Sequence, residues 1–326
     1  MNQMNTTTWL NPQTKYPISR IWFEFTVQSP IGLPEYAGSM LRGAFGGALR
    51  RTACMTRQKT CNDCPLRQTC PYPQIFEKPA PERHSLQKFS AIPNGYIIEP
   101  PTWGERVYQR GEVIRFAMVL VGQIRQHLSL VTYAWQRAFE HGIGHGTATL
   151  THVNLETEQG DIELFDEKQG SVSPINEHSI TVITPNSSST DKDKTLDFYS
   201  PLRLQSNGKA LSAANVTAAI LIKALARRAS LILEFHAGVQ LIDDFKLIAH
   251  DIERIENAAH STDKQLQWQD WTRYSSRQRT TMQLGGLVGQ WHIRNVSPEI
   301  QHLLALNTYL HIGKETTFGM GGYTAT

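Results

Sequence analysis

Apolar and polar residues alternate along the first strongly patterned segment of the chain. Across residues 18–28, ISRIWFEFTVQ, the apolar side chains Phe23, Phe25 and Val27 occupy every second position. A period of two is typical of a strand that buries one face. We therefore expect the first strand of the fold here.

The pattern then changes to a helical period. The segment EYAGSMLRGAFGGALRR, residues 35–51, places Tyr36, Met40, Ala44 and Ala48 at helical spacing, although its glycines would weaken an isolated helix. The rest of this half contains two strand-like runs, an amphipathic helix and a further strand, at residues 95–99, 112–121, 123–140 and 147–156.

The second half has the same order of elements. We expect a strand at 196–205, a helix at 213–235, strands at 277–284 and 287–295, and a helix that begins at Pro298. Each half thus contains strand, helix, strand, strand, helix and strand, which is the ferredoxin-like order. Each half also closes with a helix, a glycine-rich turn and a strand, which indicates a weak internal repeat.

A polar run, PNSSSTDKDK at residues 185–194, separates the two halves. With 326 residues the chain is long enough for two domains that each bury a core. We therefore predict an α+β fold of two tandem ferredoxin-like domains, residues 1–185 and 195–326, with a cysteine-containing insert at about 52–77 in the first.

Net charge changes this picture little, because +3 is compatible with an RNA-binding protein and with an ordinary enzyme. Two segments have a larger excess of positive charge. Residues 42–70 contain six basic side chains and one acidic one, and residues 203–228 contain five basic side chains and no acidic one. The first fifteen residues contain no apolar run like that of a secretory signal, and the apolar runs elsewhere are too short to span a bilayer. We expect a soluble cytoplasmic protein.

All four cysteines lie within seventeen residues. Their spacing, C-x6-C-x2-C-x5-C, is typical of metal ligands, because two thiolates on one short turn can bind the same ion. Four thiolates suit a tetrahedral zinc ion with no open position, so this metal would be structural and would not take part in catalysis. An iron–sulfur cluster, disulfides or free thiols are the alternatives. The predicted ligands are Cys54, Cys61, Cys64 and Cys70.

The last sixteen residues, HIGKETTFGMGGYTAT, are rich in glycine. Glycine lets main-chain N–H groups approach a ligand closely, so Gly313, Gly319, Gly321 and Gly322 are predicted to form an anion cradle, with Lys314 supplying charge. The spacing matches neither the P-loop nor the dinucleotide-binding fingerprint. An ordinary glycine-rich turn is the alternative.

Four sequence blocks occur in order along most of the chain. They are LRGAFGGALRR at 41–51, YPQIFE at 72–77 after the cysteine segment, SPLRLQSNGK at 200–209 and HIGKETTFGMGGY at 311–323. Together they resemble the CRISPR repeat-processing endoribonuclease family, the sixth of the Cas proteins, within the RAMP superfamily. The resemblance implies two ferredoxin-like RAMP domains and a terminal glycine-rich loop that contacts the CRISPR repeat RNA.

The resemblance also implies metal-independent cleavage, in which a 2′-hydroxyl attacks the adjacent phosphate and leaves a 2′,3′-cyclic phosphate and a 5′-hydroxyl. Such chemistry requires in-line positioning, proton transfer and charge stabilisation. The family's usual proton carrier is a histidine near the first helix, yet no histidine lies between Ser29 and Arg51. Tyr36, Arg42 and His145 are therefore the candidate catalytic residues. The alternatives are a core ring for Tyr36, a phosphate contact for Arg42 and a solvated side chain for His145.

Basic and loop residues make up the predicted RNA interface. Lys223, Arg227 and Arg228 form a basic stripe on a predicted helix, for which a solvated face is the alternative. His236 and His311 flank helix ends, where histidine commonly serves as a cap. The predicted RNA contacts are Arg50, Arg51, Arg203, Lys209, Lys223, Arg227, Arg228, Gly313, Lys314, Thr316, Thr317, Gly319, Gly321 and Gly322.

The main functional hypothesis is an endoribonuclease that cuts precursor CRISPR RNA within each repeat, remains bound to its product and works with other Cas proteins. Because the expected histidine is missing, a second hypothesis is a non-catalytic RAMP subunit that caps the mature RNA in an effector complex. A zinc-knuckle DNA-binding protein is a third, which the duplicated ferredoxin-like order disfavours.

Overall fold

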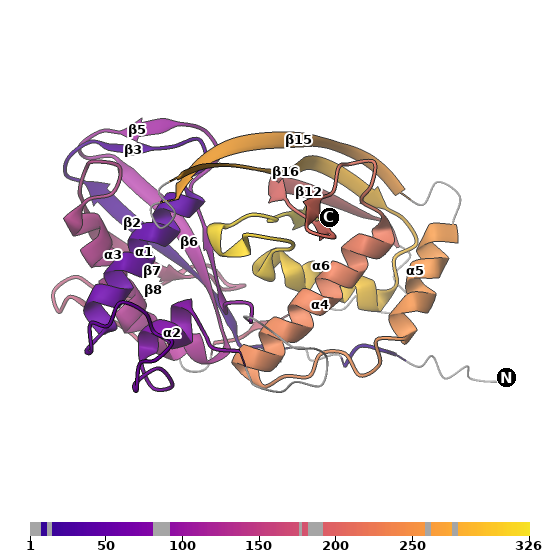
Figure 1. Ribbon diagram of the computed structural model, residues 1–326, viewed down its shortest axis with the longest axis horizontal. Coiled ribbons are helices and arrows are strands. Elements are labelled where there is room, and N and C mark those ends of the chain that lie inside the picture. The colour runs from indigo at the N-terminus through magenta and orange to yellow at the C-terminus, as the bar shows by residue number, and fades with distance from the viewer. Residues whose placement is uncertain are drawn as a thin grey trace.

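Two domains lie side by side along the long axis of the molecule, and each consists of a sheet with helices packed on it (Figure 1). The computed structural model describes residues 8–11, 15–80, 92–175, 178–181, 192–257, 262–275 and 280–326. The predicted boundary run at 185–194 therefore lies mostly outside the described residues.

The N-terminal domain has the ferredoxin-like topology. Its elements are β2 (Ile18–Val27), α1 (Gly38–Ala53), β4 (Tyr96–Glu99), β6 (Val113–Val121), α3 (Leu128–His141), β7 (Ala148–Leu155) and β8 (Ile162–Glu163). The strands pair in the order β4-β6-β2-β7-β8, and every pair is antiparallel. The first strand of the β-α-β-β-α-β unit thus lies between the third and the fourth, as the topology requires.

The C-terminal domain repeats this topology. Its elements are β12 (Lys194–Leu202), α4 (Ala218–Ala237), α5 (Leu247–Asn257), β15 (Thr262–Ser275), β16 (Thr280–Ile293), α6 (Pro298–Leu310) and β17 (Thr324–Ala325). The sheet order is β15-β16-β12-β17. The predicted tandem ferredoxin-like fold is therefore confirmed in its topology.

Short elements connect these units. Four antiparallel pairs join β1 (Lys15–Tyr16) to β11 (Ile180–Thr181), β3 (Ile31–Leu33) to β5 (Arg106–Tyr108), β9 (Phe165–Asp166) to β10 (Ser171–Val172) and β13 (Gln205–Ser206) to β14 (Lys209–Ala210). The remaining elements are α2 (Pro71–Phe76) and the 3₁₀ turns η1 (Gly122–His127) and η2 (Thr316–Phe318).

Periodicity predicted most of the N-terminal domain. Phe23, Phe25 and Val27 are buried along β2, as the alternation indicates. The helix expected at 123–140 forms, but its first turn is η1. Helix α1 begins at Gly38, and its buried face includes Leu41, Phe45 and Ala48. Of the predicted face, Ala48 is therefore buried, whereas Met40 and Ala44 are only half-buried.

The strands predicted at 277–284 and 287–295 are wrong. Residues 280–293 form one strand, β16, whose partner β15 precedes it in sequence. The adjacent glycines Gly285 and Gly286 resemble a turn, but a Cβ at Gly286 would lie 2.7 Å from the carbonyl oxygen of Leu202. Glycine inside a strand marks such a close approach of a neighbouring backbone. Helix α5 was not predicted at all.

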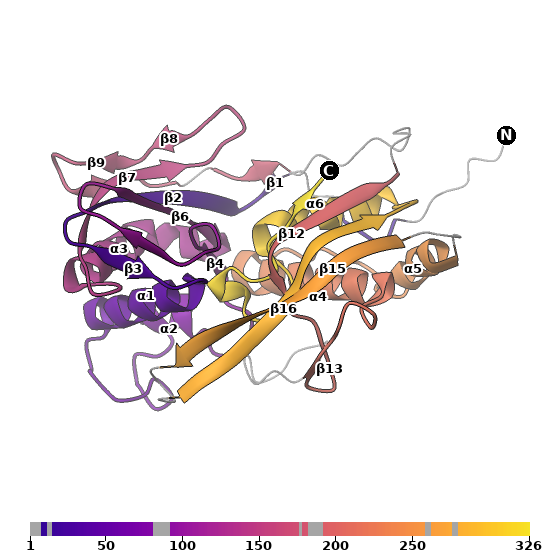
Figure 2. The same ribbon diagram turned by 90° about the horizontal axis from the view of Figure 1, so that it is seen from above.

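The β15–β16 hairpin extends from its own sheet towards the N-terminal domain (Figures 1 and 2). There the Trp271 ring lies 4.8 Å from the Tyr36 ring, centroid to centroid. These two residues form a small core with Leu284, Phe318 and Met320, separate from the main core of each domain. The glycine-rich loop is thus packed between the two domains.

None of the helices in the described parts of the chain is both long enough and apolar enough to serve as a membrane span.

Candidate functional site

A cavity of about 540 Å³ opens between the two domains. Side chains from β2, from the end of β4 and from β12 form its walls, together with the glycine-rich loop that follows α6. Four partly exposed aromatic side chains line it, namely Trp22, Trp103, Tyr199 and Tyr309. A cavity with aromatic walls and a few polar groups is a typical ligand site.

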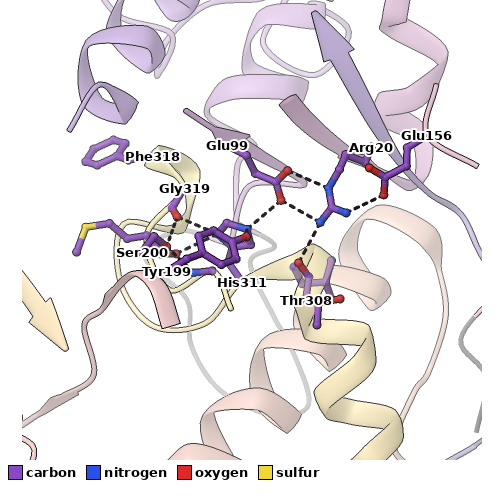
Figure 3. Close-up of polar contacts among 12 residues, drawn as sticks. Arg20, Glu99, Glu156, Tyr199, Ser200, Thr308, His311, Phe318 and Gly319 are labelled. Atoms are coloured by element: carbon purple, nitrogen blue, oxygen red, sulfur yellow. Dashed lines mark hydrogen bonds and ion pairs between the residues drawn. The ribbon is translucent and has the colours of Figure 1, made fainter. Parts of the chain in front are cut away.

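One wall of the cavity is an ion-pair network that joins the domains (Figure 3). Arg20 Nε lies 2.9 Å from Glu99 Oε2, and Arg20 Nη1 lies 2.8 Å from Glu156 Oε1. Arg20 Nη2 also donates to the main-chain oxygen of Thr308 in α6, at 3.1 Å. Both terminal nitrogens of the guanidinium therefore donate hydrogen bonds, and Nε is in ion-pair contact with Glu99, which holds Arg20 between the domains.

The charges of this network support one another. Burial by itself raises the pKa of Glu99, but the neighbouring Arg20 and His311 outweigh it, and the pKa lies below its ordinary value. For Arg20, burial alone lowers the pKa, whereas Glu99 and Glu156 raise it above its ordinary value. Glu99 is therefore an anion held between two nitrogen-bearing side chains.

His311 connects the network to the glycine-rich loop. It follows α6 with φ of 54°, and its side chain is completely buried. Nδ1 lies 3.0 Å from the Gly319 oxygen, and Nε2 lies 3.0 Å from Glu99 Oε1 and 3.4 Å from the hydroxyl of Tyr199. The sequence interpretation of His311 as a simple helix cap missed this site, because Glu99 and Tyr199 are distant in sequence.

The glycine-rich loop does not offer the predicted anion cradle. The N–H groups of Gly319 and Gly321 donate to the oxygens of Thr316 and Pro201, each at 2.9 Å, and that of Gly322 donates to Ser200 Oγ at 2.7 Å. These three glycines are buried. Their main-chain donors are already used within the fold, so the prediction that they contact phosphate is wrong for this conformation.

The rest of the loop has mixed exposure. Lys314 is exposed, Gly313 and Thr317 are partly exposed, and Thr316 is buried. The main-chain N–H of Lys314 donates to the main-chain oxygen of Arg203 at 2.9 Å, and the side chain with its ammonium group is exposed. Of the predicted loop contacts, Lys314 is the best placed to reach a phosphate.

The three predicted catalytic residues do not converge. Tyr36 lines the cavity, but it is 5% exposed and its hydroxyl donates to the Phe318 oxygen at 2.9 Å; burial raises its pKa well above the ordinary value. The Arg42 guanidinium lies over the rings of Phe76 and Phe318, at 4.3 and 5.4 Å. His145 is exposed in the turn before β7 and does not line the cavity.

Three of the basic side chains predicted to contact RNA donate hydrogen bonds to main-chain oxygens of the protein instead. Arg228 Nε donates to the oxygens of Leu310 and His311, at 2.8 and 2.9 Å, so it caps α6. Arg203 Nη1 donates to the Gly285 oxygen at 2.7 Å, and Arg50 Nη2 donates to the Lys59 oxygen at 2.8 Å. The exposed members of the predicted set are Arg51, Lys209, Lys223, Arg227 and Lys314.

The four cysteines lie between α1 and α2, and all of them line one small cavity. Among the residues that the structure describes, no three His, Cys, Asp or Glu side chains form a ready-made metal site. The zinc site therefore stays a prediction.

Two family models match separate parts of the chain. Residues 16–177 match one described as an N-terminal domain, and residues 196–323 match the CRISPR-associated endoribonuclease Cas6. An uncharacterized protein of Archaeoglobus fulgidus is 20% identical over 295 residues, which are 89% of this chain and 91% of the relative.

Solved structures share the fold across both domains. A Cas6 product complex superposes with a TM-score of 0.54 at 14% identity, over 95% of this chain and 100% of the other. Thermus thermophilus Cas6 gives 0.51 at 14% identity, over 97% of this chain and 100% of the other. A partial Cas6-RT-Cas1–Cas2 complex gives 0.52 at 15% identity, over 98% of this chain and 47% of the other.

The fold that this chain shares with the Cas6 structures consists of two tandem ferredoxin-like domains, and in this chain a buried glycine-rich loop lies between them. The Cas6 model matches almost all of the second domain, and the Cas6 fold extends over nearly the whole chain. Residues 196–323 therefore match the Cas6 family, and the fold of the whole chain is similar to that of solved Cas6 structures.

Proposed function

We propose that this protein binds the repeats of precursor CRISPR RNA and cleaves them at the interdomain cavity, without a catalytic metal. The observation that carries the proposal is the buried His311 on the cavity wall, within the Cas6 domain and in contact with Glu99 of the other domain. The products would carry a 2′,3′-cyclic phosphate and a 5′-hydroxyl. Other Cas proteins would be its partners in the same system.

The aromatic walls suit single-stranded nucleotides at the cleavage point. Sequence-specific RNA binding commonly stacks an unpaired base on an aromatic side chain. Tyr199 is 51% exposed, and Trp103 is oriented by a hydrogen bond of 3.0 Å from Nε1 to Glu35 Oε1. These rings would hold a splayed base, while exposed cations such as Lys314 bind the backbone.

The proton transfer would use His311 and Tyr199. The attacking 2′-oxygen loses a proton as it bonds to phosphorus, and the departing 5′-oxygen gains one as the P–O5′ bond breaks. The imidazole is buried, but the Tyr199 hydroxyl lies 3.4 Å from Nε2 and its side chain reaches the solvent-exposed wall. Tyr199 would therefore connect the histidine to the RNA, and Glu99 would hold the ring in place.

Single-turnover cleavage of a cognate repeat in excess EDTA tests this function. We expect His311→Asn and Tyr199→Phe to lower the rate about 100-fold or more, which is the typical contribution of a general acid or base. His145→Ala is the matched control, because its ring lies outside the cavity, and should cleave like the unmodified protein. Thermal melting and repeat binding of each variant separate loss of chemistry from loss of fold.

The outcomes distinguish the two functional hypotheses. Undiminished cleavage by stably folded His311→Asn and Tyr199→Phe proteins would exclude this site. Loss of cleavage in His145→Ala would move the chemistry to the turn before β7. Tight repeat binding with no cleavage by the unmodified protein would instead support a non-catalytic subunit that caps the RNA.

A further inference from the structure

The segment between α1 and α2 has no core of its own. From residue 51 to residue 71 no side chain is buried, and Met55 is 84% exposed. The segment consists of turns and bends, apart from the helix ends on either side. A short segment that buries no apolar surface requires another source of order, such as a disulfide or a structural metal.

All four cysteines of the protein surround a single cavity in this segment. Cys54 directly follows α1 and Cys70 directly precedes α2. Cys61 and Cys64 lie in one turn, closed by a hydrogen bond of 3.3 Å from Cys64 N to the Cys61 oxygen. The cavity that they line has a volume of about 10 Å³. This is about the space that one water-sized probe occupies, and so the space for a single small ion.

The thiols are free and line the same cavity. None forms a disulfide. The Thr56 hydroxyl oxygen lies 3.4 Å from Cys64 Sγ and 4.0 Å from Cys54 Sγ, so it stands between two of the four sulfurs. Since these thiols have not converged on one point, an ion would bind as the side chains rotate into the cavity that they already line.

The surrounding charges suit such a site. Four thiolates around a divalent zinc ion carry a net charge of −2. The same segment holds Arg51, Arg57, Lys59 and Arg67, and Arg50 directly precedes it, but it has only one acid, Asp63. A metal–thiolate centre would thus account for the local excess of basic side chains, which the sequence interpretation assigned to RNA.

We propose that Cys54, Cys61, Cys64 and Cys70 bind one zinc ion as four thiolates, in a closed structural site that joins the end of α1 to the start of α2. Zinc takes four cysteine ligands in tetrahedral geometry, and binding releases the four thiol protons. The metal would not contact RNA or take part in cleavage.

The site would also support the packing of α2 on α1. Phe76 of α2 lies so close to Gly46 that a Cβ there would be 2.3 Å from the Phe76 ring. Arg42 lies over the same ring and over Phe318 of the glycine-rich loop. Loss of zinc would therefore loosen α2 and the cysteine segment first, while both ferredoxin-like sheets stay folded.

Elemental analysis of protein purified without chelator tests the proposal. We expect about one zinc per chain, and less than a fifth of that in a Cys61→Ser/Cys64→Ser double variant. Thr56→Ala is the matched control, because it removes a side chain that lines the same cavity but is not a ligand, and it should retain the zinc. Cobalt substitution should produce the absorption bands of tetrahedral thiolate coordination in the unmodified protein alone.

Less than half an equivalent of zinc after refolding with excess zinc would overturn the proposal, as would an iron–sulfur cluster or disulfide-bonded cysteines. Full zinc retention by the double variant would show that the metal lies elsewhere. Because metal content is measured without RNA, this result is independent of the cleavage assay, and either proposal can fail alone.

Discussion

At the scale of single residues, the glycines of the terminal loop serve packing. Gly321 has φ of 72°, and a Cβ there would lie 1.8 Å from the main-chain oxygen of Ile312. We expect Gly321→Ala to lower the free energy of unfolding by about 3 kcal/mol or more, since both the backbone angle and the contact are unfavourable. Gly208→Ala is the control, because its φ is also positive, at 76°, but no atom lies within 4 Å of a Cβ there. Urea denaturation measures both, and equal losses would contradict the packing argument.

At the scale of elements, Arg228 of α4 caps the C-terminal end of α6. Its partly buried guanidinium donates from Nε to the oxygens of Leu310 and His311 where α6 ends, and burial lowers its pKa to about 9. We expect Arg228→Met to lower the free energy of unfolding by about 2 kcal/mol, the scale of a hydrogen bond to a charged group. Lys223→Met, at an exposed position of the same helix, is the control and should change stability by less than about 0.5 kcal/mol. An equal loss in both variants would contradict the capping role.

The glycine-rich loop also carries a prediction about RNA binding. Lys314 is exposed beside the loop, so we expect Lys314→Ala to reduce the salt dependence of repeat binding by roughly one phosphate contact. Measurement of affinity over a range of salt concentrations gives the slope directly. An unchanged slope in Lys314→Ala would place the RNA backbone away from this loop.

At the scale of the whole molecule, two buried histidines make the stability of the protein depend on pH. His236 at the end of α4 contacts the Pro93 oxygen of the N-terminal domain, at 2.8 Å from Nε2, and His302 of α6 contacts the Tyr16 hydroxyl at 2.7 Å. Burial lowers the pKa of each to about 4. Unfolded histidine titrates near 6.5, so between these values the unfolded chain binds more protons and acid destabilises the fold.

We therefore expect the unfolding free energy to fall as pH decreases from about 6.5 towards 4, by roughly 2 kcal/mol for each histidine by pH 5. Urea denaturation at pH 7.5 and pH 5 measures the change. His302→Gln should reduce it, whereas His145→Gln, at an exposed position, should leave it unaltered. A His302→Gln protein with the full pH dependence would contradict this origin.

The sequence by itself determined the order of elements in the N-terminal domain, because hydrophobic periodicity is a local property of each segment. The alternation around Phe23 and Phe25 and the helical spacing before His141 are present whatever the chain packs against. The four sequence blocks likewise indicated the resemblance to the Cas6 family, whose model matches residues 196–323. Where periodicity was ambiguous, as at Gly285 and Gly286 in β16, local patterns were not sufficient.

Only the tertiary structure decided which residues share a site. Glu99, Tyr199 and His311 belong to three segments of two domains, and nothing local marks them as neighbours. The same holds for burial, since Arg227 and Arg228 are adjacent in sequence but one is exposed and the other caps α6. Residue type states what chemistry a side chain can perform. Whether its donors and charges are free to perform it depends on contacts that form only when the two domains pack together.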